Sequence, residues 1–195
     1  MAYRHYEVEG LIINHRNLGE ANRLYQVLTD DFGLINVLAQ GVRLDKSKLR
    51  HHLQNFSFAR LVLVRGREFW RVVGVSDIGL PKKRTREVLL FFKKISLVLL
   101  RLIHGEDPRS LLYQDLKRAF DLILARESLS EEELANLEIF ILARIFLKLG
   151  YLAEALGSKK IFSEENFSWP EVAEAGALRI SLIRQINQAL ELSQL

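Results

Sequence analysis

The chain has 195 residues, of which 49% are hydrophobic and 27% charged, a composition that excludes wholesale disorder. It contains no cysteine, which excludes disulfides and thiolate metal sites. Residues 1–86 hold 15 Lys and Arg against 8 Asp and Glu, whereas residues 87–195 hold 13 against 16. A cationic N-terminal half is typical of a module that binds a polyanion, and a merely solvated basic surface is the alternative.

The first half of the chain has the residue pattern of a small β-sheet. Apolar and β-branched residues predict strands over 3–15, 21–29, 34–40, 56–64 and 68–76. Turns separate most of these strands, and a longer connection separates the third from the fourth. Five strands with this excursion predict an OB-fold β-barrel, and an SH3-like barrel, which also has about five strands, is the alternative topology.

The connection over residues 42–54 is strongly basic and has room for one helical turn. Its cations are closely spaced and opposed only by Asp45, so they suit contact with successive phosphates without reading a base sequence. The candidates for nucleic-acid binding here are Arg43, Lys46, Lys48, Arg50 and His51.

More candidate residues lie on and between the strands. Arg65 and Arg67 flank the expected turn between the fourth and fifth strands. Arg23 and Arg71 either line the same groove or pair with neighbouring glutamates. Each would add a phosphate contact to the surface that we expect to bind nucleic acid.

Two aromatic residues and a basic hinge complete the candidate interface. Tyr25 and Trp70 could stack on bases, and packing in the core of a small barrel is the alternative for both. Lys82, Lys83 and Arg84 follow the end of the sheet, and they either extend the DNA-binding surface or keep the hinge soluble.

The rest of the chain is expected to be helical, giving an α+β protein with domains over 1–80 and 81–195. Apolar spacing predicts a helix over 88–103, and a second begins at Asp107-Pro108. Ser130 starts a third, nearly all-apolar helix that should be the central one, and Ser168 starts a last helix. Lys93, Lys94 and Arg101 interrupt the most apolar segment, which argues against a membrane span.

Catalytic motifs are absent from the sequence, so we expect no enzymatic activity. Gly157-Ser158-Lys159 lacks the upstream glycine of a phosphate-binding loop, and Ile78 replaces the second glycine of a nucleophile elbow. His51 and His52 are adjacent, and neighbouring side chains do not converge on one metal ion. We therefore expect neither a metal nor another cofactor.

Short motifs follow one another in a fixed order over about the first third of the chain. They are Glu9-Gly10-Leu11-Ile12, Glu20, Leu28-Thr29, Gly33, Ala39-Gln40-Gly41-Val42-Arg43, Ser47-Lys48 and Leu53-Gln54, with Leu147-Lys148-Leu149-Gly150-Tyr151 much later. In these motifs the chain resembles the RecO family of bacterial DNA repair and recombination mediators.

This resemblance implies an N-terminal OB-fold, a helical second domain, binding of single- and double-stranded DNA, and strand annealing. It also implies partners: RecR, RecA indirectly, and the acidic C-terminal tail of a single-stranded DNA-binding protein. Many family members carry a cysteine zinc site after the Leu-Gly-Tyr segment. This chain cannot form such a site, because it contains no cysteine. The cations expected to be exposed for the tail are Lys93, Lys94, Arg101, Lys117, Arg118, Arg144 and Lys148.

The first residues show no signal-peptide pattern, so we expect a cytoplasmic protein without a membrane partner. Two other functions remain as alternatives to a DNA-binding mediator. One is an OB-fold RNA-binding protein, and the other is a protein-interaction adaptor whose basic charge is incidental.

Overall fold

The computed structural model describes residues 4–79, 85–103, 105–108, 110–152 and 160–192. The packing of the chain divides it into two compact units, Met1–Pro81 with Ile103–Tyr113, and Lys82–Leu102 with Gln114–Leu195. The domains expected over 1–80 and 81–195 stay a prediction, to which this packing adds that Ile103–Tyr113 joins the first unit.

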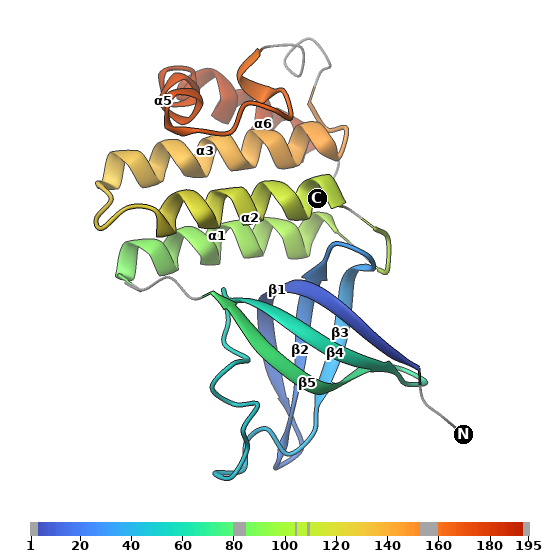
Figure 1. Cartoon of the computed structure of the whole chain (residues 1–195). Coiled ribbons are helices and arrows are strands. Elements are labelled where there is room, and N and C mark those ends of the chain that lie inside the picture. Colours follow the sequence, from blue (N-terminus) through green and yellow to red (C-terminus); the bar gives the residue numbers. More distant parts are fainter. Residues whose placement is uncertain (1–3, 80–84, 104, 109, 153–159, 193–195) are drawn as a thin grey trace. The chain divides into compact units, whose positions relative to one another are not determined.

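The first unit is built from five strands that close into a barrel (Figure 1). The strands are β1 (His5–Leu18), β2 (Asn22–Thr29), β3 (Gly33–Ala39), β4 (Phe58–Arg65) and β5 (Trp70–Gly79). Their order around the barrel is β1-β2-β3-β5-β4, with β3 and β5 parallel and the other pairs antiparallel. This is the five-stranded OB-fold barrel that the sequence predicts, and the helices that follow it confirm the α+β class.

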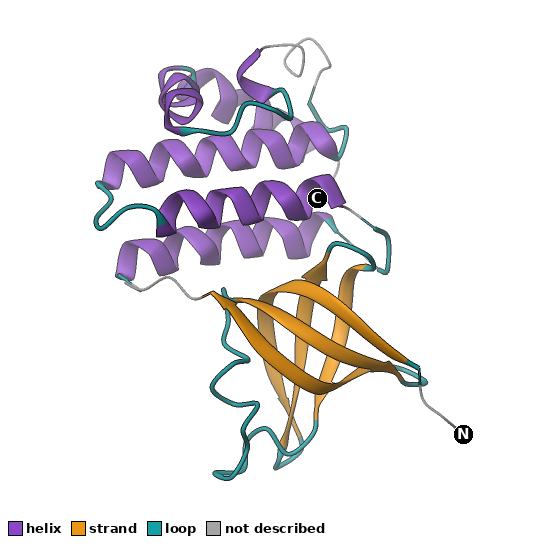
Figure 2. Cartoon of the chain, in the orientation of Figure 1, coloured by secondary structure: helices purple, strands orange, loops and turns teal. Residues whose placement is uncertain are grey.

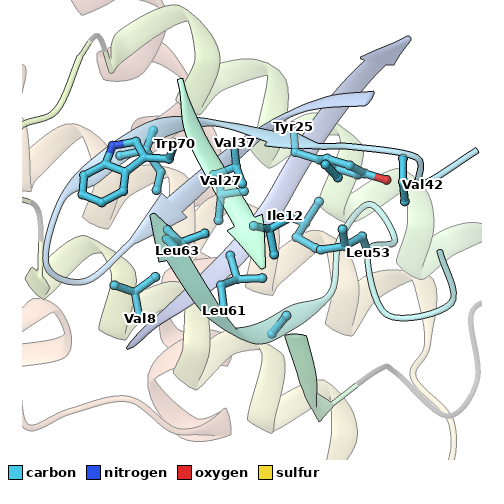
Figure 3. Packing of buried hydrophobic residues seen from close by; sticks show 14 residues of the cluster. Val8, Ile12, Tyr25, Val27, Val37, Val42, Leu53, Leu61, Leu63 and Trp70 are labelled. Carbon is cyan, nitrogen blue, oxygen red and sulfur yellow. The ribbon is translucent and has the colours of Figure 1, made fainter. Parts of the chain in front are cut away.

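Alternate residues of the strands fill the barrel interior, because successive side chains of a strand point to opposite faces. Figure 3 shows Val27, Val37 and Leu61 in the middle of this core. A register shift in β1 between Ile12 and Asn14 marks a β-bulge, and bulges give strands the bend that a small closed barrel requires.

The connection between β3 and β4 is a long loop whose residues form turns, bends or irregular structure (Figure 2). The helical turn for which its sequence has room is represented by a single bond, from the Leu53 N–H to the Leu49 carbonyl at 3.1 Å. Strand β4 begins at Phe58, later than expected, because Phe56 has a φ of 63° that a strand cannot contain. The Phe56 N–H donates instead to the Ile12 carbonyl at 2.7 Å.

The helices are α1 (Arg86–Leu102), α2 (Ser110–Leu124), α3 (Glu131–Lys148), the short 3₁₀ helix η1 (Lys160–Phe162), α5 (Trp169–Ala177) and α6 (Arg179–Leu192). Helix α3 packs against α1, α5 and α6, which confirms its predicted central position (Figure 1). The predicted capping box at its start is present, since Ser130 and Glu133 exchange hydrogen bonds of 3.1 and 2.8 Å. The single last helix of the prediction is interrupted at Leu178, between α5 and α6.

The helical unit contains a buried ion pair that the sequence pattern does not reveal. Arg144 of α3, only 1% exposed, donates from Nε and Nη2 to the two carboxylate oxygens of Asp115 at 2.8 and 3.0 Å. Lys148 contacts the same carboxylate at 3.0 Å. Burial lowers the pKa of Lys148, and the Asp115 carboxylate opposes this shift. The expectation that Arg144 and Lys148 are exposed cations is therefore wrong.

Arg144 also fixes the segment that follows η1 against α3. Its Nη1 donates to the Ser163 carbonyl at 3.1 Å. Its guanidinium lies 5.4 Å from the Phe140 ring centroid and 5.2 Å from that of Phe167. One side chain thus joins α2, α3 and the segment before α5 through charge, hydrogen bonds and cation–π contacts.

Candidate nucleic-acid interface

The basic connection is anchored to the barrel at both ends. Val42 at its start and Leu53 near its end are fully buried members of the barrel core, and Leu49 packs against the same core. Figure 3 shows Val42 and Leu53 close to Tyr25, with Trp70 at the opposite end of the core. Because apolar side chains hold both ends, the cations between them are presented from a fixed loop.

Arg43 braces this loop against the turn between β1 and β2. Its backbone N–H donates to the Ala21 carbonyl at 3.0 Å, and its Nη1 donates to the Gly19 carbonyl at 2.9 Å. The Gly41 N–H beside it donates to the side-chain oxygen of Asn22 at 2.9 Å. The backbone N–H and Nη1 of Arg43 are thus committed within the protein, so we assign it a structural role in addition to its predicted phosphate contact.

The remaining cations of the connection face solvent. Lys46, Lys48, Arg50 and His51 are all exposed. Arg50 lies 3.5 Å from Asp45, and both side chains are well exposed, so this pair neutralises little charge. The connection therefore presents the row of solvent-facing positive charges that its sequence predicts.

A second group of cations lines an open hollow at the turn between β4 and β5. The structure brings together Arg65, Arg67 and Arg71, three of the predicted DNA-binding residues, around a volume of about 670 Å³. The other lining residues are Leu38, Gln40, Gly66, Glu68 and Phe69. The cations of the basic connection are not among them. The predicted DNA-binding residues described so far thus form two groups on the barrel unit.

Gly66 makes the β4–β5 turn tight enough to bring the arginines together. Its N–H donates to the Phe69 carbonyl at 3.1 Å. A Cβ at position 66 would lie 2.3 Å from that same oxygen, so any other residue would open the turn. In OB-folds, oligonucleotides bind to a surface between the β4–β5 turn and the β1–β2 turn. The hollow lies at the β4–β5 side of this surface.

Arg23 lies at the start of β2, outside the lining of the hollow. Its Nε donates to the side-chain oxygen of Asn17 at 3.4 Å, an exposed contact across the β1–β2 hairpin. Burial raises the pKa of Tyr25, and the nearby Arg23 guanidinium opposes that rise. Arg23 therefore lies beside the β1–β2 hairpin, which Arg43 also contacts, and not in the hollow.

The two aromatic residues considered for base stacking are buried in the barrel core. Tyr25 and Trp70 are 1% and 2% exposed and belong to the barrel core, so neither can stack on a base. The structure offers Phe69 instead, which is half-buried and lines the hollow with the three arginines. Sequence reasoning missed Phe69, although an aromatic residue inside a polar turn was a usable signal.

Three further candidates, Lys82, Lys83 and Arg84, lie outside the described residues. Among the described residues, no group of three or more His, Asp or Glu could hold a metal ion. No helix in that part of the chain is long and apolar enough to span a membrane.

Helix α1 carries a separate exposed stripe in the helical unit. Leu90 and Leu97, 44% and 59% exposed, share it with Lys94 and Arg101 at the i, i+4, i+7 and i+11 positions of one face. Lys94 pairs with Glu138 of α3 at 2.7 Å. The stripe therefore combines apolar and cationic side chains on one helix.

The alternative helical faces offer less. Arg118 of α2 donates to the Glu164 carbonyl, at 2.5 Å, and the α3 cations Arg144 and Lys148 are committed to Asp115. Lys117 of α2 is half-buried. Helix α2 exposes one leucine, Leu111 (44%), whereas α1 exposes two, Leu90 and Leu97, on a face that also carries exposed cations.

Comparison with known proteins bears on the first unit. The barrel is an OB-fold, an architecture that also occurs in proteins that bind oligonucleotides and oligosaccharides. Residues 1–79 match the family model described as "Recombination protein O N terminal". This match confirms the resemblance of the N-terminal part of the chain to the RecO family, which its motifs indicate.

Curated relatives extend the match. The DNA repair protein RecO of Gloeothece citriformis is 30% identical over 111 residues, which cover 56% of this chain and 39% of that protein. RecO of Dehalococcoides mccartyi is 37% identical over 73 residues, covering 37% of this chain and 29% of that protein. The matched part thus spans well under half the length of either relative, and both relatives are named as DNA repair proteins.

Proposed function

We propose that this chain is a non-catalytic DNA-binding mediator of recombination and repair in the cytoplasm. In this role it binds single- and double-stranded DNA, anneals complementary strands, and assists RecA loading together with RecR. The observation that carries the proposal is the hollow on the OB-fold barrel, which Arg65, Arg67 and Arg71 line together with Phe69. Cations for phosphates beside an aromatic face for bases are the two components of single-strand recognition.

Annealing follows from the same chemistry. The exposed row formed by Lys46, Lys48 and Arg50 would neutralise phosphates of each bound strand, while the bases of the strands stay available for pairing. An OB-fold protein that preferred RNA would instead need to recognise the 2′-hydroxyl group. An adaptor with incidental charge would bind no nucleic acid in a steeply salt-dependent way.

A titration of labelled single-stranded DNA at 50 and 200 mM salt tests the proposal. For about five phosphate contacts, affinity should fall by about 100-fold between these concentrations. A matched RNA oligonucleotide is the comparison: tighter binding of RNA would favour the RNA-binding alternative. Weak binding without salt dependence would support the adaptor.

Phe69→Leu is expected to weaken single-strand binding by about tenfold or more, because stacking on one base contributes about 1–3 kcal/mol. Duplex binding should change little, since paired bases are not available to stack on Phe69. The matched control is Phe69→Trp, which keeps an aromatic face and should bind nearly as well as the wild type. Equal single-strand affinity of the Leu and Trp variants would show that Phe69 does not stack on bases.

For the acidic tail of a single-stranded DNA-binding protein, we propose the α1 stripe as the docking face. The tail ends in an apolar residue, which Leu90 and Leu97 can contact. Its carboxylates suit Arg101 of the stripe and the exposed Lys93, which lies at i+3 from Leu90 on the same face. Leu97→Ser is expected to weaken micromolar binding of a tail peptide by about tenfold, because it removes one of the two exposed apolar side chains of the stripe.

Calorimetric titration of the full chain with the peptide measures this effect. Ile180→Ser provides the matched control, because Ile180 of α6 is also strongly exposed and lies outside the stripe. If both substitutions weaken binding equally, the α1 stripe is not the docking face.

A further inference from the structure

The segment between α1 and α2 docks tightly on the barrel and reaches the residues beside the hollow. The Trp70 indole N–H donates to Oε1 of Glu106 at 2.9 Å, and Arg65 donates from Nη2 to Oε2 at 3.0 Å. The Arg65 guanidinium also lies 5.0 Å from the Trp70 ring centroid. One carboxylate from outside the strands thus bridges the last residue of β4 and the first residue of β5.

Two further features show that this docking is built into the barrel. Trp70 is 2% exposed, and a buried indole N–H requires an acceptor, which Glu106 supplies. At Gly33, which has a φ of 67°, a Cβ would lie 2.0 Å from the Asp107 carbonyl oxygen, so the backbone of the segment needs a glycine there. Glu106 is therefore held beside Arg65 by contacts that do not involve Arg65.

We infer that Glu106 is an internal competitor for the phosphate that Arg65 would bind. The inference rests on the proposed function, because it assigns a regulating residue to the same hollow. Arg65 is one of three arginines that line this hollow, and the Glu106 carboxylate occupies part of its hydrogen-bonding fork. A phosphate on Arg65 stands close to a second negative charge, and this repulsion lowers the affinity of the hollow.

The competitor also ties DNA binding to the position of the α1–α2 segment. While the segment is docked, the guanidinium of Arg65 is shared between Glu106 and the hollow. When the segment moves away from Trp70, the full charge of Arg65 becomes available to a phosphate. Any partner that displaces residues 105–108 would by this route tighten the hold of the barrel on DNA.

Glu106→Gln tests the inference, because glutamine keeps an acceptor for the Trp70 indole and removes the charge. Measured by anisotropy with an oligothymidylate at 50 mM salt, we expect E106Q to bind about threefold to tenfold more tightly than wild type. The log-log salt slope should steepen by up to about one unit. In an Arg65→Ala background the same substitution should have no effect, because the shared cation is gone.

Glu9→Gln is the matched control. Glu9 pairs with Arg60 at 2.9 Å on β1 and β4, so E9Q removes an equivalent charge and ion pair outside the hollow. Similar or weaker binding by E106Q compared with E9Q overturns the inference, as does a gain that persists without Arg65. Wild-type protein that binds no oligonucleotide would refute the proposed function and this inference together. Melting temperatures of both variants confirm that each is folded.

Discussion

Replacing Lys46, Lys48 and Arg50 together by alanine is expected to weaken binding of single-stranded DNA by about 100-fold at low salt. All three side chains are exposed, and the pair of Arg50 with Asp45 is a weak one at 3.5 Å, so each cation can contact a phosphate. The log-log salt slope should fall by about two units, because each phosphate neutralised on a single strand adds about 0.7 to it. Anisotropy titrations over a range of salt concentrations measure both quantities.

Arg43 is left out of this variant because its loss would disturb the loop itself, through the Gly19 and Ala21 carbonyls. The matched control replaces Lys160, Arg179 and Arg184, three exposed cations of the helical unit, and changes the net charge by the same amount. Equal effects of the two triple variants would show that affinity follows net charge alone. If the salt slope of the Lys46, Lys48 and Arg50 variant were unchanged, the phosphate contacts would lie at the hollow instead of the connection.

Arg144→Met is expected to lower the free energy of unfolding of the helical unit by about 3–5 kcal/mol, because it leaves the carboxylate of Asp115 buried with one partner fewer. It also removes the donor to the Ser163 carbonyl. Hydrogen exchange of the α3 amides and denaturant unfolding measure this effect. Exchange in the barrel strands should be unaffected.

Two companion variants separate charge from geometry. Arg144→Lys keeps the charge and loses the planar fork, so it should recover only part of the stability. Arg144→Met combined with Asp115→Leu removes the unpaired carboxylate and should be more stable than Arg144→Met alone. If the single and double variants were equally destabilised, the ion pair would not be the source of the effect.

The sequence predicts local features well, and it predicts poorly those that depend on contacts between distant residues. The strands follow from alternation, and the capping box at Ser130 follows from its spacing to Glu133. The burial of Arg144 does not follow, because a lone cation on an apolar helix is normally solvated and its partner Asp115 is 29 residues away. Its predicted exposure is wrong for that reason.

The same limit applies to the candidate site. Arg65 and Arg67 lie beside the β4–β5 turn as the sequence places them, since a tight turn brings its flanking residues together, whereas the sequence left the position of Arg71 in the hollow open. Whether Tyr25 and Trp70 face the core or solvent depends on which side of each strand is inside, and an alternating sequence with apolar residues on both faces leaves that open. The docking of Glu106 on Trp70 joins residues 36 positions apart, and no local pattern marks it.

The parallel pairing of β3 with β5 is short, since it joins only Val37 to Trp70 and Leu38 to Arg71. This pairing is the seam at which the barrel is closed with the fewest backbone hydrogen bonds. Leu38 and Arg71, on its two sides, both line the hollow. A strand of DNA bound in the hollow would therefore contact residues on both sides of this pairing. Because DNA would bind only the closed barrel there, its binding free energy would stabilise the barrel against separation of β3 from β5.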